Sequence, residues 1–274
     1  MNKDGENVPV MSKTENVLQQ YSDDKKLSIR SKLHAKHSTN KQGFGSWLFE
    51  KYRFSENTSI LELGCGSGWQ WEWDRKVEQL PQGCKLILSD FSEGMVNIAR
   101  GRFYSYNADV DFQKIDVQEI PYGDESFDVV IANHVLYHVP DLNKALSEVR
   151  RVMKNGGRFY SVTNGNGGMS LFLHKALRNF DPKTEAFSQR YSFSLQNGGE
   201  LLRKYFSSVE RLDYEDSLAV TETQDLIDWI KSTISISGYS DNTLTELYEY
   251  FEAIRIKEGT INVPKEVGLF ISIK

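Results

Sequence analysis

The stretch Glu62-Leu63-Gly64-Cys65-Gly66-Ser67-Gly68 decides the fold, because it ends a short apolar strand pattern at 59–63 and precedes a helical segment. Glycines at three alternate positions permit positive φ and let a ligand approach the backbone without an intervening Cβ. A glycine turn that opens a helix is a general device for binding nucleotides. A dinucleotide-binding turn would follow Gly-x-Gly-x-x-Gly, but Trp69 stands at the sixth position from Gly64. The loop therefore favours a nucleoside over a dinucleotide.

Four further strand patterns surround this loop, at 85–89, 110–115, 127–132 and 158–162. The run 127–132 is continuously apolar after Asp128, as expected of a central parallel strand buried on both faces. A helical pattern precedes the last strand; Asp141 can cap it and Asn155-Gly156-Gly157 ends it. Strands that alternate with helical patterns predict a parallel, doubly wound sheet.

The second half of the chain continues this sheet with helical additions. A glycine-rich loop at 163–168 leads to helical patches at 171–177 and 201–206, then to one long strand at 209–220. Residues 222–257 are helical, with a capping box formed by Thr243 and Glu246. A final strand at 267–273 makes 222–257 an insertion between two strands of one sheet. We predict an α/β fold, a Rossmann-like, doubly wound, seven-stranded, mostly parallel sheet with helical lid insertions.

Composition excludes several classes of protein. The 274 residues carry a net charge of −5 and contain only two cysteines, too few for a disulfide framework. No apolar run approaches the ~18 residues of a membrane span, and the first ten residues lack the layout of a signal peptide. No overall basic field exists to attract nucleic acid. We therefore expect a cytoplasmic protein with no membrane span and no nucleic-acid partner.

Polar residues follow the other strands at the same edge of the sheet. Asp90 ends the second strand, where a carboxylate can accept both hydroxyls of a ribose. Asp116 and Val117 follow the third strand and could meet an adenine edge. The segment 133–138, Asn-His-Val-Leu-Tyr-His, follows the fourth. Ligands of open α/β sheets bind at these carboxyl ends, so the four groups predict one nucleoside site.

The loop ELGCGSG, the stretch SDFSEGM, the block DVQEIPYGDESFDVVIANHVLYHV and the helix end VMKNGG resemble a class I S-adenosylmethionine-dependent methyltransferase. Within that superfamily they are most similar to the small-molecule branch typified by ubiquinone/menaquinone-biosynthesis-like enzymes (methyltransferase type 11). The resemblance covers about residues 55–164. It implies three parts of a single domain: 1–54 as an N-terminal tail and helical lid, 55–164 as the cofactor-binding core, and 165–274 as the rest of the sheet with substrate-cap insertions.

The resemblance also implies roles for single residues. Gly64 and Gly66 would line the methionine half of the cofactor, with Glu62 and Gly68 supporting them. Asp90 would bind the ribose hydroxyls. The backbone of Asn133 would face the methionyl ammonium. The adenine would be contacted by Phe91, Met95, Asp116 and Val117. The cofactor would be S-adenosyl-L-methionine, and its product S-adenosyl-L-homocysteine.

Methyl transfer from a sulfonium is an in-line displacement that needs alignment, and a base only if the nucleophile arrives protonated. His138, His134 and Tyr137 are the candidate catalytic acid–base groups, and packing is the alternative role for each. His134 and His138 would share a face on a helical turn. A zinc pair has the same spacing, but no third ligand follows, so we predict no metal site. Cys65 is expected to be a small buried residue rather than a nucleophile.

The N-terminal segment and the aromatic residues could complete the site. Arg30 could clamp the cofactor carboxylate, since a guanidinium suits bidentate binding, or it could be a solvated helix arginine. Tyr21 and Trp47 could cover the cofactor or substrate. Trp69, Trp71 and Trp73 cannot all face the core of one helix, so at least one is expected to face a cavity or the lid.

We expect methyl transfer to an O, N or C nucleophile of a small-molecule metabolite, by a monomer or homodimer. The aromatic, helical insertions suit enclosure of a small acceptor substrate. Two alternatives stay close to this reading: a protein methyltransferase, and a non-catalytic S-adenosylmethionine-binding module. A nucleotide-binding oxidoreductase is a third, although the missing sixth-position glycine argues against it.

Overall fold

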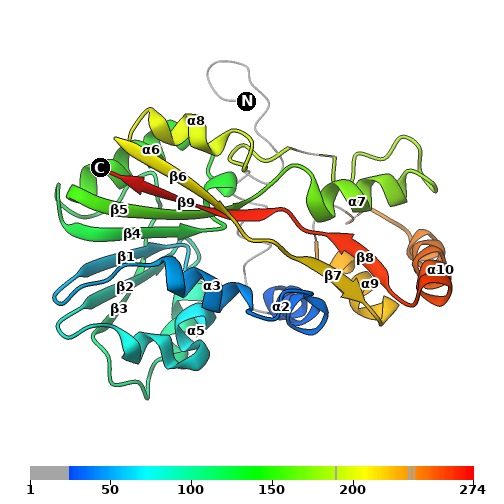
Figure 1. Cartoon of the computed structure of the whole chain (residues 1–274), viewed down its shortest axis with the longest axis horizontal. Helices are drawn as coiled ribbons and strands as arrows, with labels where there is room; N and C mark the ends of the chain where they lie inside the picture. Colours follow the sequence, from blue (N-terminus) through cyan, green and yellow to red (C-terminus); the bar gives the residue numbers. More distant parts are fainter. Residues whose placement is uncertain (1–24, 189, 234–235, 237) are drawn as a thin grey trace.

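The structure, a computed structural model, describes residues 25–188, 190–233, 236 and 238–274. In these residues a helical cap lies beyond the carboxyl ends of the parallel strands of a sheet (Figure 1). None of the described helices is long and apolar enough to cross a membrane. The core helices are α3 (Phe44–Lys51), α4 (Trp69–Glu72), η2 (Trp73–Gln79), α5 (Glu93–Arg102), η3 (Leu136–His138), α6 (Leu142–Val152) and α8 (Gly198–Arg203).

Seven strands form the main sheet in the order β3-β2-β1-β4-β5-β9-β6. β9 runs antiparallel to both of its neighbours, β5 and β6, and the other pairings in the main sheet are parallel. This arrangement confirms the predicted seven-stranded, mostly parallel, doubly wound sheet. The strands are β1 (Ser59–Leu63), β2 (Lys85–Asp90), β3 (Val110–Lys114), β4 (Phe127–Asn133), β5 (Met153–Asn164), β6 (Ser208–Asp213) and β9 (Val267–Ile273).

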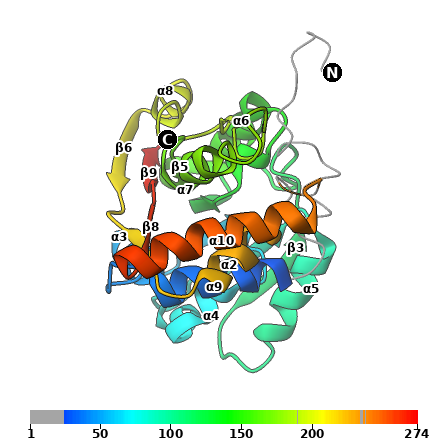
Figure 2. The ribbon, with the colours of Figure 1, turned by 90° about the vertical axis from the view of Figure 1, so that its right-hand side faces the viewer.

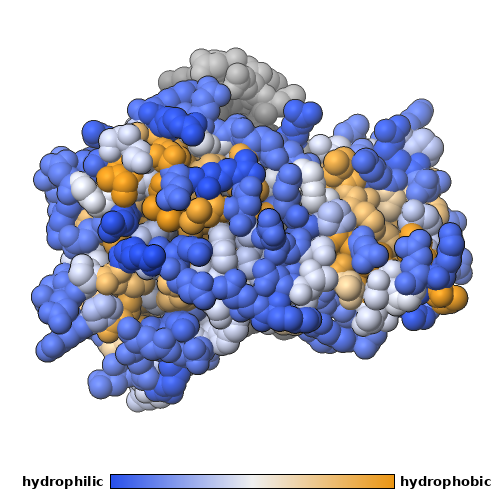
Figure 3. Space-filling view, in the orientation of Figure 1, coloured by the Kyte–Doolittle hydropathy of each residue, from blue (hydrophilic) through white to orange (hydrophobic). Residues whose placement is uncertain are grey.

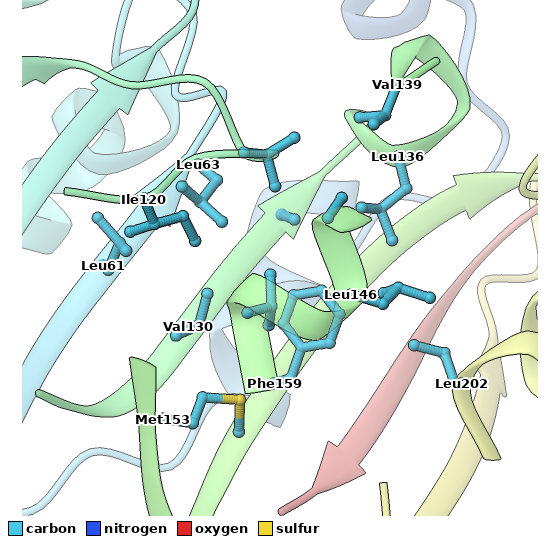
Figure 4. Packing of buried hydrophobic residues seen from close by; sticks show 14 of the residues in the cluster. Leu61, Leu63, Ile120, Val130, Leu136, Val139, Leu146, Met153, Phe159 and Leu202 are labelled. Carbon is cyan, nitrogen blue, oxygen red and sulfur yellow. The ribbon is translucent and has the colours of Figure 1, made fainter. Parts of the chain in front are cut away.

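The two faces of the sheet bury different side chains, because successive residues of a strand point to opposite faces. Leu61 and Val130 pack with Leu146 of α6 and Leu202 of α8 on one face (Figure 4). Ile60, next to Leu61, packs on the other face in a cluster with residues of α3 and α4. Each central strand is thus buried on both sides, which explains its continuous apolar run.

The cap has its own hydrophobic core. It consists of α2 (Lys25–His37), α7 (Gly168–Leu177), α9 (Thr223–Lys231), α10 (Asp241–Glu258) and the two-stranded sheet β7 (Ser217–Val220) and β8 (Ile261–Pro264). Fully buried Leu226, Leu247 and Phe251 lie at its centre. Figure 2 looks onto this part of the molecule, with α10 across the front. In the space-filling view polar residues cover most of the face, and apolar side chains show chiefly over the sheet and over the cap (Figure 3).

A two-stranded ribbon joins the sheet to the cap. The pairing Asp213↔Gly268 in the main sheet and the pairing Ser217↔Pro264 in the cap keep one register. Between them the Tyr214 N–H donates to the Val267 carbonyl at 3.0 Å. The predicted single strand over 209–220 is therefore wrong in detail: it is divided into β6 and β7, which belong to different sheets.

Asp216 explains this division. Its fully buried carboxylate accepts hydrogen bonds from the Ser38 hydroxyl at 2.7 Å and the Asn40 backbone N–H at 3.0 Å, and it forms an ion pair with Lys265. Lys265 lies opposite Asp216 on the returning strand. The pair therefore ties the segment after α2 to the ribbon where the sheet and the cap meet.

Three other sequence expectations need correction. The helix before β5 begins at Leu142, with the Asp141 side chain accepting from the Lys144 N–H as predicted, but it ends at Val152, and Met153 already belongs to β5. The predicted capping box is wrong, because Ser240 caps α10 by accepting from the Thr243 N–H. The expected alternation of strands with helices is also incomplete, because residues 115–126, between β3 and β4, contain no helix.

Candidate functional site

A cavity of about 1320 Å³ lies between the carboxyl ends of the parallel strands and the cap. The core side supplies the glycine loop, the ends of β2 and β4, and the segments that follow them. The cap side supplies residues of α2, α7 and α9 and the ribbon. Of the predicted site residues, all but two line the cavity: Arg30, Glu62, Gly64, Gly66, Asp90, Phe91, Asp116, Val117, Asn133, His134, Tyr137 and His138.

The two exceptions are Gly68 and Met95. Gly68 is buried beside the Phe103 ring, which lies 2.9 Å from the position of an added Cβ. Met95 is fully buried in α5. Both residues therefore pack beneath the cavity instead of lining it.

The glycine loop needs glycine at Gly64 for two reasons. Its φ is +72°, and a Cβ there would lie 2.2 Å from Cγ2 of Val135. Gly64 thus lets the loop touch the segment that follows β4. The Gly66 N–H donates to Asp90 Oδ2 at 2.9 Å, so the loop is also tied to the end of β2.

Asp90 is held by backbone donors at both oxygens. Its Oδ1 accepts from the Ser92 N–H at 2.8 Å, and Ser92 caps α5. Burial raises the pKa of Asp90, while the backbone N–H groups of Ser92 and Gly66 oppose that rise. Each carboxylate oxygen retains a lone pair for a further donor, as binding of hydroxyl groups would require.

Glu62 and Trp71 form a buried pair below the loop. The Trp71 indole N–H donates to the Glu62 carboxylate. Burial raises the pKa of Glu62 to about 7, and the indole hydrogen bond opposes the rise. Trp69 and Trp73 are 38% and 43% exposed, line the cavity and stack at 5.9 Å. The expectation that at least one of the three tryptophans faces a cavity is therefore confirmed.

Asp116 and Val117 follow β3. Asp116 Oδ1 accepts from the Gln118 N–H at 2.9 Å, which turns the chain along the cavity edge. Val117 is 8% exposed and joins the core on the α6 face of the sheet. The two residues bring a carboxylate and an apolar side chain to one end of the cavity.

The segment after β4 differs from the helical turn expected for it. His134 has φ +59°, and only Leu136–His138 form a short 3₁₀ turn, so His134 and His138 do not lie on a common helical turn. Burial lowers the pKa of His134 to about 4, with a smaller contribution from His138, so its imidazole is neutral at neutral pH. Tyr137 contacts His138 at a ring distance of 4.5 Å.

Of the N-terminal residues expected to cover the cofactor or substrate, Arg30 lines the cavity and Trp47 does not. Arg30 lines the cavity, but its Nε and Nη2 donate to Ser232 at 3.1 and 2.7 Å. Two of its donors are thus already used within the cap. Trp47 is buried and packs against Tyr214 at 5.2 Å, away from the cavity lining. Tyr21 lies outside the described residues.

The structure adds cavity residues that sequence reasoning missed. His34 of α2 lines the cavity, and burial lowers the pKa of its imidazole to about 3. Phe44, Tyr191, Trp229 and Lys265 also line it. Their positions depend on how the cap folds over the sheet, and no motif marks them.

Cys65 is a thiol that lines the cavity. Among the described residues no group of three His, Cys, Asp or Glu side chains could hold a metal ion. Burial raises the pKa of the Cys65 thiol well above its ordinary value. A protonated thiol is a poor nucleophile.

Comparison with protein families and curated relatives supports the motif reading. Residues 61–161 match the family model described as a methyltransferase domain. Demethylmenaquinone methyltransferase of Lactococcus lactis is 33% identical over 115 residues, which are 42% of this chain and 45% of that protein. Malonyl-[acyl-carrier protein] O-methyltransferase of Buchnera aphidicola is 34% identical over 137 residues, 50% of this chain and 51% of that protein. The chain thus matches about half or less of the length of these relatives.

Residues 61–161 therefore match a methyltransferase domain, in agreement with the resemblance to class I S-adenosylmethionine-dependent methyltransferases. The curated relatives that match this part of the chain are named as methyltransferases, which agrees with the predicted family.

Solved structures support the fold beyond the matched domain. Phosphoethanolamine N-methyltransferase 2 of Haemonchus contortus, in complex with S-adenosyl-L-methionine, gives a TM-score of 0.59 at 17% identity over 97% of this chain and 60% of that one. The [4+2]-cyclase SpnF gives the same TM-score and identity over 97% of both chains. At such identities the likeness establishes the architecture alone, because one fold can carry different chemistries.

Proposed function

We propose that this chain transfers a methyl group from S-adenosyl-L-methionine to a small-molecule acceptor bound between the sheet and the cap. The observation that carries the proposal is the convergence of Gly64, Gly66, Asp90, Asp116 and Asn133 on one cavity at the carboxyl ends of the strands. In an open α/β sheet this edge is where nucleotides bind.

The cofactor roles follow the order of the strands. Asp90, with both oxygens held by backbone N–H groups, is proposed to accept the ribose hydroxyls. Phe91, Asp116 and Val117 would contact the adenine, and the glycine loop and Asn133 would contact the methionine half. Glu62 supports the loop from below, where its carboxylate accepts the Trp71 indole N–H.

The bound cofactor supplies an activated methyl group, so the protein's part is alignment, exclusion of water and, for a protonated nucleophile, removal of a proton. His138 is the proposed base, and Tyr137 and His134 are the alternatives. The low pKa of His134, about 4, makes it a weak base. His134 therefore suits a hydrogen-bonding role better than proton abstraction.

The charges around the cavity favour an acceptor without a phosphate or carboxylate. Each lysine or arginine among the described lining residues already has a protein partner. Lys265 pairs with Asp216, Arg102 with Glu72, and Lys32 lies 3.9 Å from Asp225. Lys41 donates to the Ser38 carbonyl, and Arg30 donates to Ser232. An anionic acceptor would therefore compete with these contacts for the remaining donors, whereas a neutral aromatic or apolar acceptor would not.

Calorimetry with S-adenosylhomocysteine tests the cofactor site. Asp90→Ala should abolish measurable binding, because it removes the acceptor of two charge-assisted hydrogen bonds worth about 1.5–3 kcal/mol each. Asp111→Ala, an exposed aspartate on β3, is the matched control and should bind as the wild type does. Equal affinity of the wild type and Asp90→Ala would refute the assignment, and stabilisation by NAD in place of S-adenosylhomocysteine would favour an oxidoreductase.

We also propose a monomer or homodimer that acts in the cytoplasm on neither nucleic acid nor membranes. The net charge of −5 supports this, because it offers no overall attraction to phosphate backbones. The protein methyltransferase and the non-catalytic binding module remain the alternatives. Formation of S-adenosylhomocysteine with a small acceptor and not with protein substrates would support a small-molecule methyltransferase. Formation only with protein substrates would favour a protein methyltransferase, and formation with neither would favour a binding module.

A further inference from the structure

A buried polar network lies behind the end of β4. Tyr52, the residue after α3, is 4% exposed, and its hydroxyl oxygen accepts from Asn133 Nδ2 at 2.7 Å and from Gln70 Nε2 at 3.2 Å. Asn133 Nδ2 also donates to Gln70 Oε1 at 3.1 Å. Three elements, α3, α4 and β4, thus converge on one side-chain amide.

With Tyr52 and Gln70 placed as they are, this network sets the orientation of the Asn133 amide. An amide nitrogen has two hydrogens, and the Tyr52 hydroxyl and Gln70 Oε1 accept both. Rotating the amide by 180° would set its oxygen against Gln70 Oε1, which is also an acceptor. The Asn133 side chain therefore has one orientation while Tyr52 and Gln70 hold their positions.

The same orientation leaves Asn133 Oδ1 without a partner. This oxygen is buried and accepts no hydrogen bond from any described residue. Buried polar atoms are nearly always paired, and an unpaired one costs about 1–3 kcal/mol. Asn133 and Gln70 both line the cavity, beside Glu62 and Gly64, so a ligand with an N–H donor at this end would satisfy the oxygen.

We propose that Tyr52 and Gln70 are positioning residues that present Asn133 Oδ1 to the α-amino group of the cofactor. The inference rests on the proposed function, which places the methionine half of S-adenosylmethionine against the glycine loop and Asn133. An ammonium group offers three donors and no acceptor, so it matches an amide oxygen and not an amide nitrogen. Tyr52 does not line the cavity and acts only through Asn133.

The test compares ligands that differ at the amino-acid end. Binding of S-adenosylhomocysteine, of its analogue without the α-amino group, and of its decarboxylated analogue is measured by calorimetry on the wild type, Tyr52→Phe and Asn133→Ala. Tyr52→Phe should bind S-adenosylhomocysteine and the decarboxylated analogue about 10-fold more weakly, which corresponds to about 1.4 kcal/mol. Its affinity for the deaminated analogue should equal that of the wild type.

Tyr160→Phe is the matched control. Tyr160 is fully buried in the same cluster, its ring lies 4.9 Å from that of Tyr52, and its hydroxyl accepts from the Arg53 N–H. This variant should lose comparable thermal stability but bind all three ligands as the wild type does. In an Asn133→Ala background, Tyr52→Phe should cause no further loss of affinity, because the two residues act on one contact.

Three results would overturn the proposal. Equal weakening of all three ligands by Tyr52→Phe would mean that Tyr52 supports the site only as packing. Weakening that spares only the decarboxylated analogue would mean that the amide is reversed and that its nitrogen binds the carboxylate. Independent losses for Tyr52→Phe and Asn133→Ala would mean that Tyr52 does not act through Asn133. Failure of the wild type to bind S-adenosylhomocysteine would instead refute the proposed function itself.

Discussion

Gly64→Ala tests the contact between the glycine loop and the segment after β4. At φ +72° a Cβ costs about 1–2 kcal/mol, the penalty of a left-handed conformation for an L-residue. That Cβ would also lie 2.2 Å from Val135 Cγ2, and relieving such overpacking costs about 1–3 kcal/mol more. The free energy of unfolding should therefore fall by about 2–5 kcal/mol, the sum of these two costs.

Gly156→Ala provides the comparison, since Gly156 has a similar φ of +75° but no heavy atom within 4 Å of an added Cβ. It should lose only the conformational term of about 1–2 kcal/mol. Urea unfolding followed by tryptophan fluorescence measures both variants, and Val135→Ala should restore part of the stability lost in Gly64→Ala. Equal losses for the two glycine variants, or no recovery with Val135→Ala, would refute the steric argument.

Three further predictions concern buried or catalytic groups. The pKa of Glu62 is raised from its ordinary 4.5 to about 7, so its contribution to stability is present below pH 4.5 and is lost as the pH rises through 7. The wild type should therefore lose about 3 kcal/mol of unfolding free energy over this pH range, and Glu62→Gln should not show this loss. The same pH dependence of the unfolding free energy in both proteins would contradict the assignment. Asp216→Ala should cost about 3–5 kcal/mol, because it leaves the Lys265 ammonium mostly buried and unpaired. The control Asp213→Ala, whose pair with Arg211 is exposed, should cost at most about 1 kcal/mol, and similar losses for both would contradict this account. His138→Ala should bind S-adenosylhomocysteine as the wild type does, but it should form S-adenosylhomocysteine more slowly when an acceptor is present. An unchanged rate of methyl transfer would show that His138 is not the base.

The central strands and the glycine loop could be predicted because their signals are local. Each of these signals, an apolar run, a glycine or a capping residue, spans only a few consecutive positions. Asp141, for example, caps its helix as expected. The sequence places the end of that helix too late, because Met153 is apolar and fits the helical stripe equally well. It enters β5 instead, where it pairs with Phe127.

The acceptor half of the cavity could not be predicted, because its residues meet only in three dimensions. His34 and Trp229 are about 200 positions apart and reach one cavity through packing of α2 against α9. The division of the strand at 214–216 also depends on a tertiary partner, since Asp216 pairs with Lys265 and with the segment after α2. In the sequence, the apolar period-two series Leu212, Tyr214, Leu218 and Val220 is interrupted only by Asp216, and one polar residue does not by itself mark the end of a strand.

The ribbon that joins the sheet to the cap allows the acceptor side of the cavity to change in sequence independently of the sheet. Val220 and Ile261 are paired neighbours, so the forty residues between them leave and re-enter the fold at one place. A segment with adjacent ends can be lengthened, shortened or exchanged without altering the strand pairing below it. A single-residue insertion within the ribbon would instead turn every following side chain to the opposite face. New acceptor preferences can therefore arise by replacement of 221–260, while the cofactor half of the protein stays as it is.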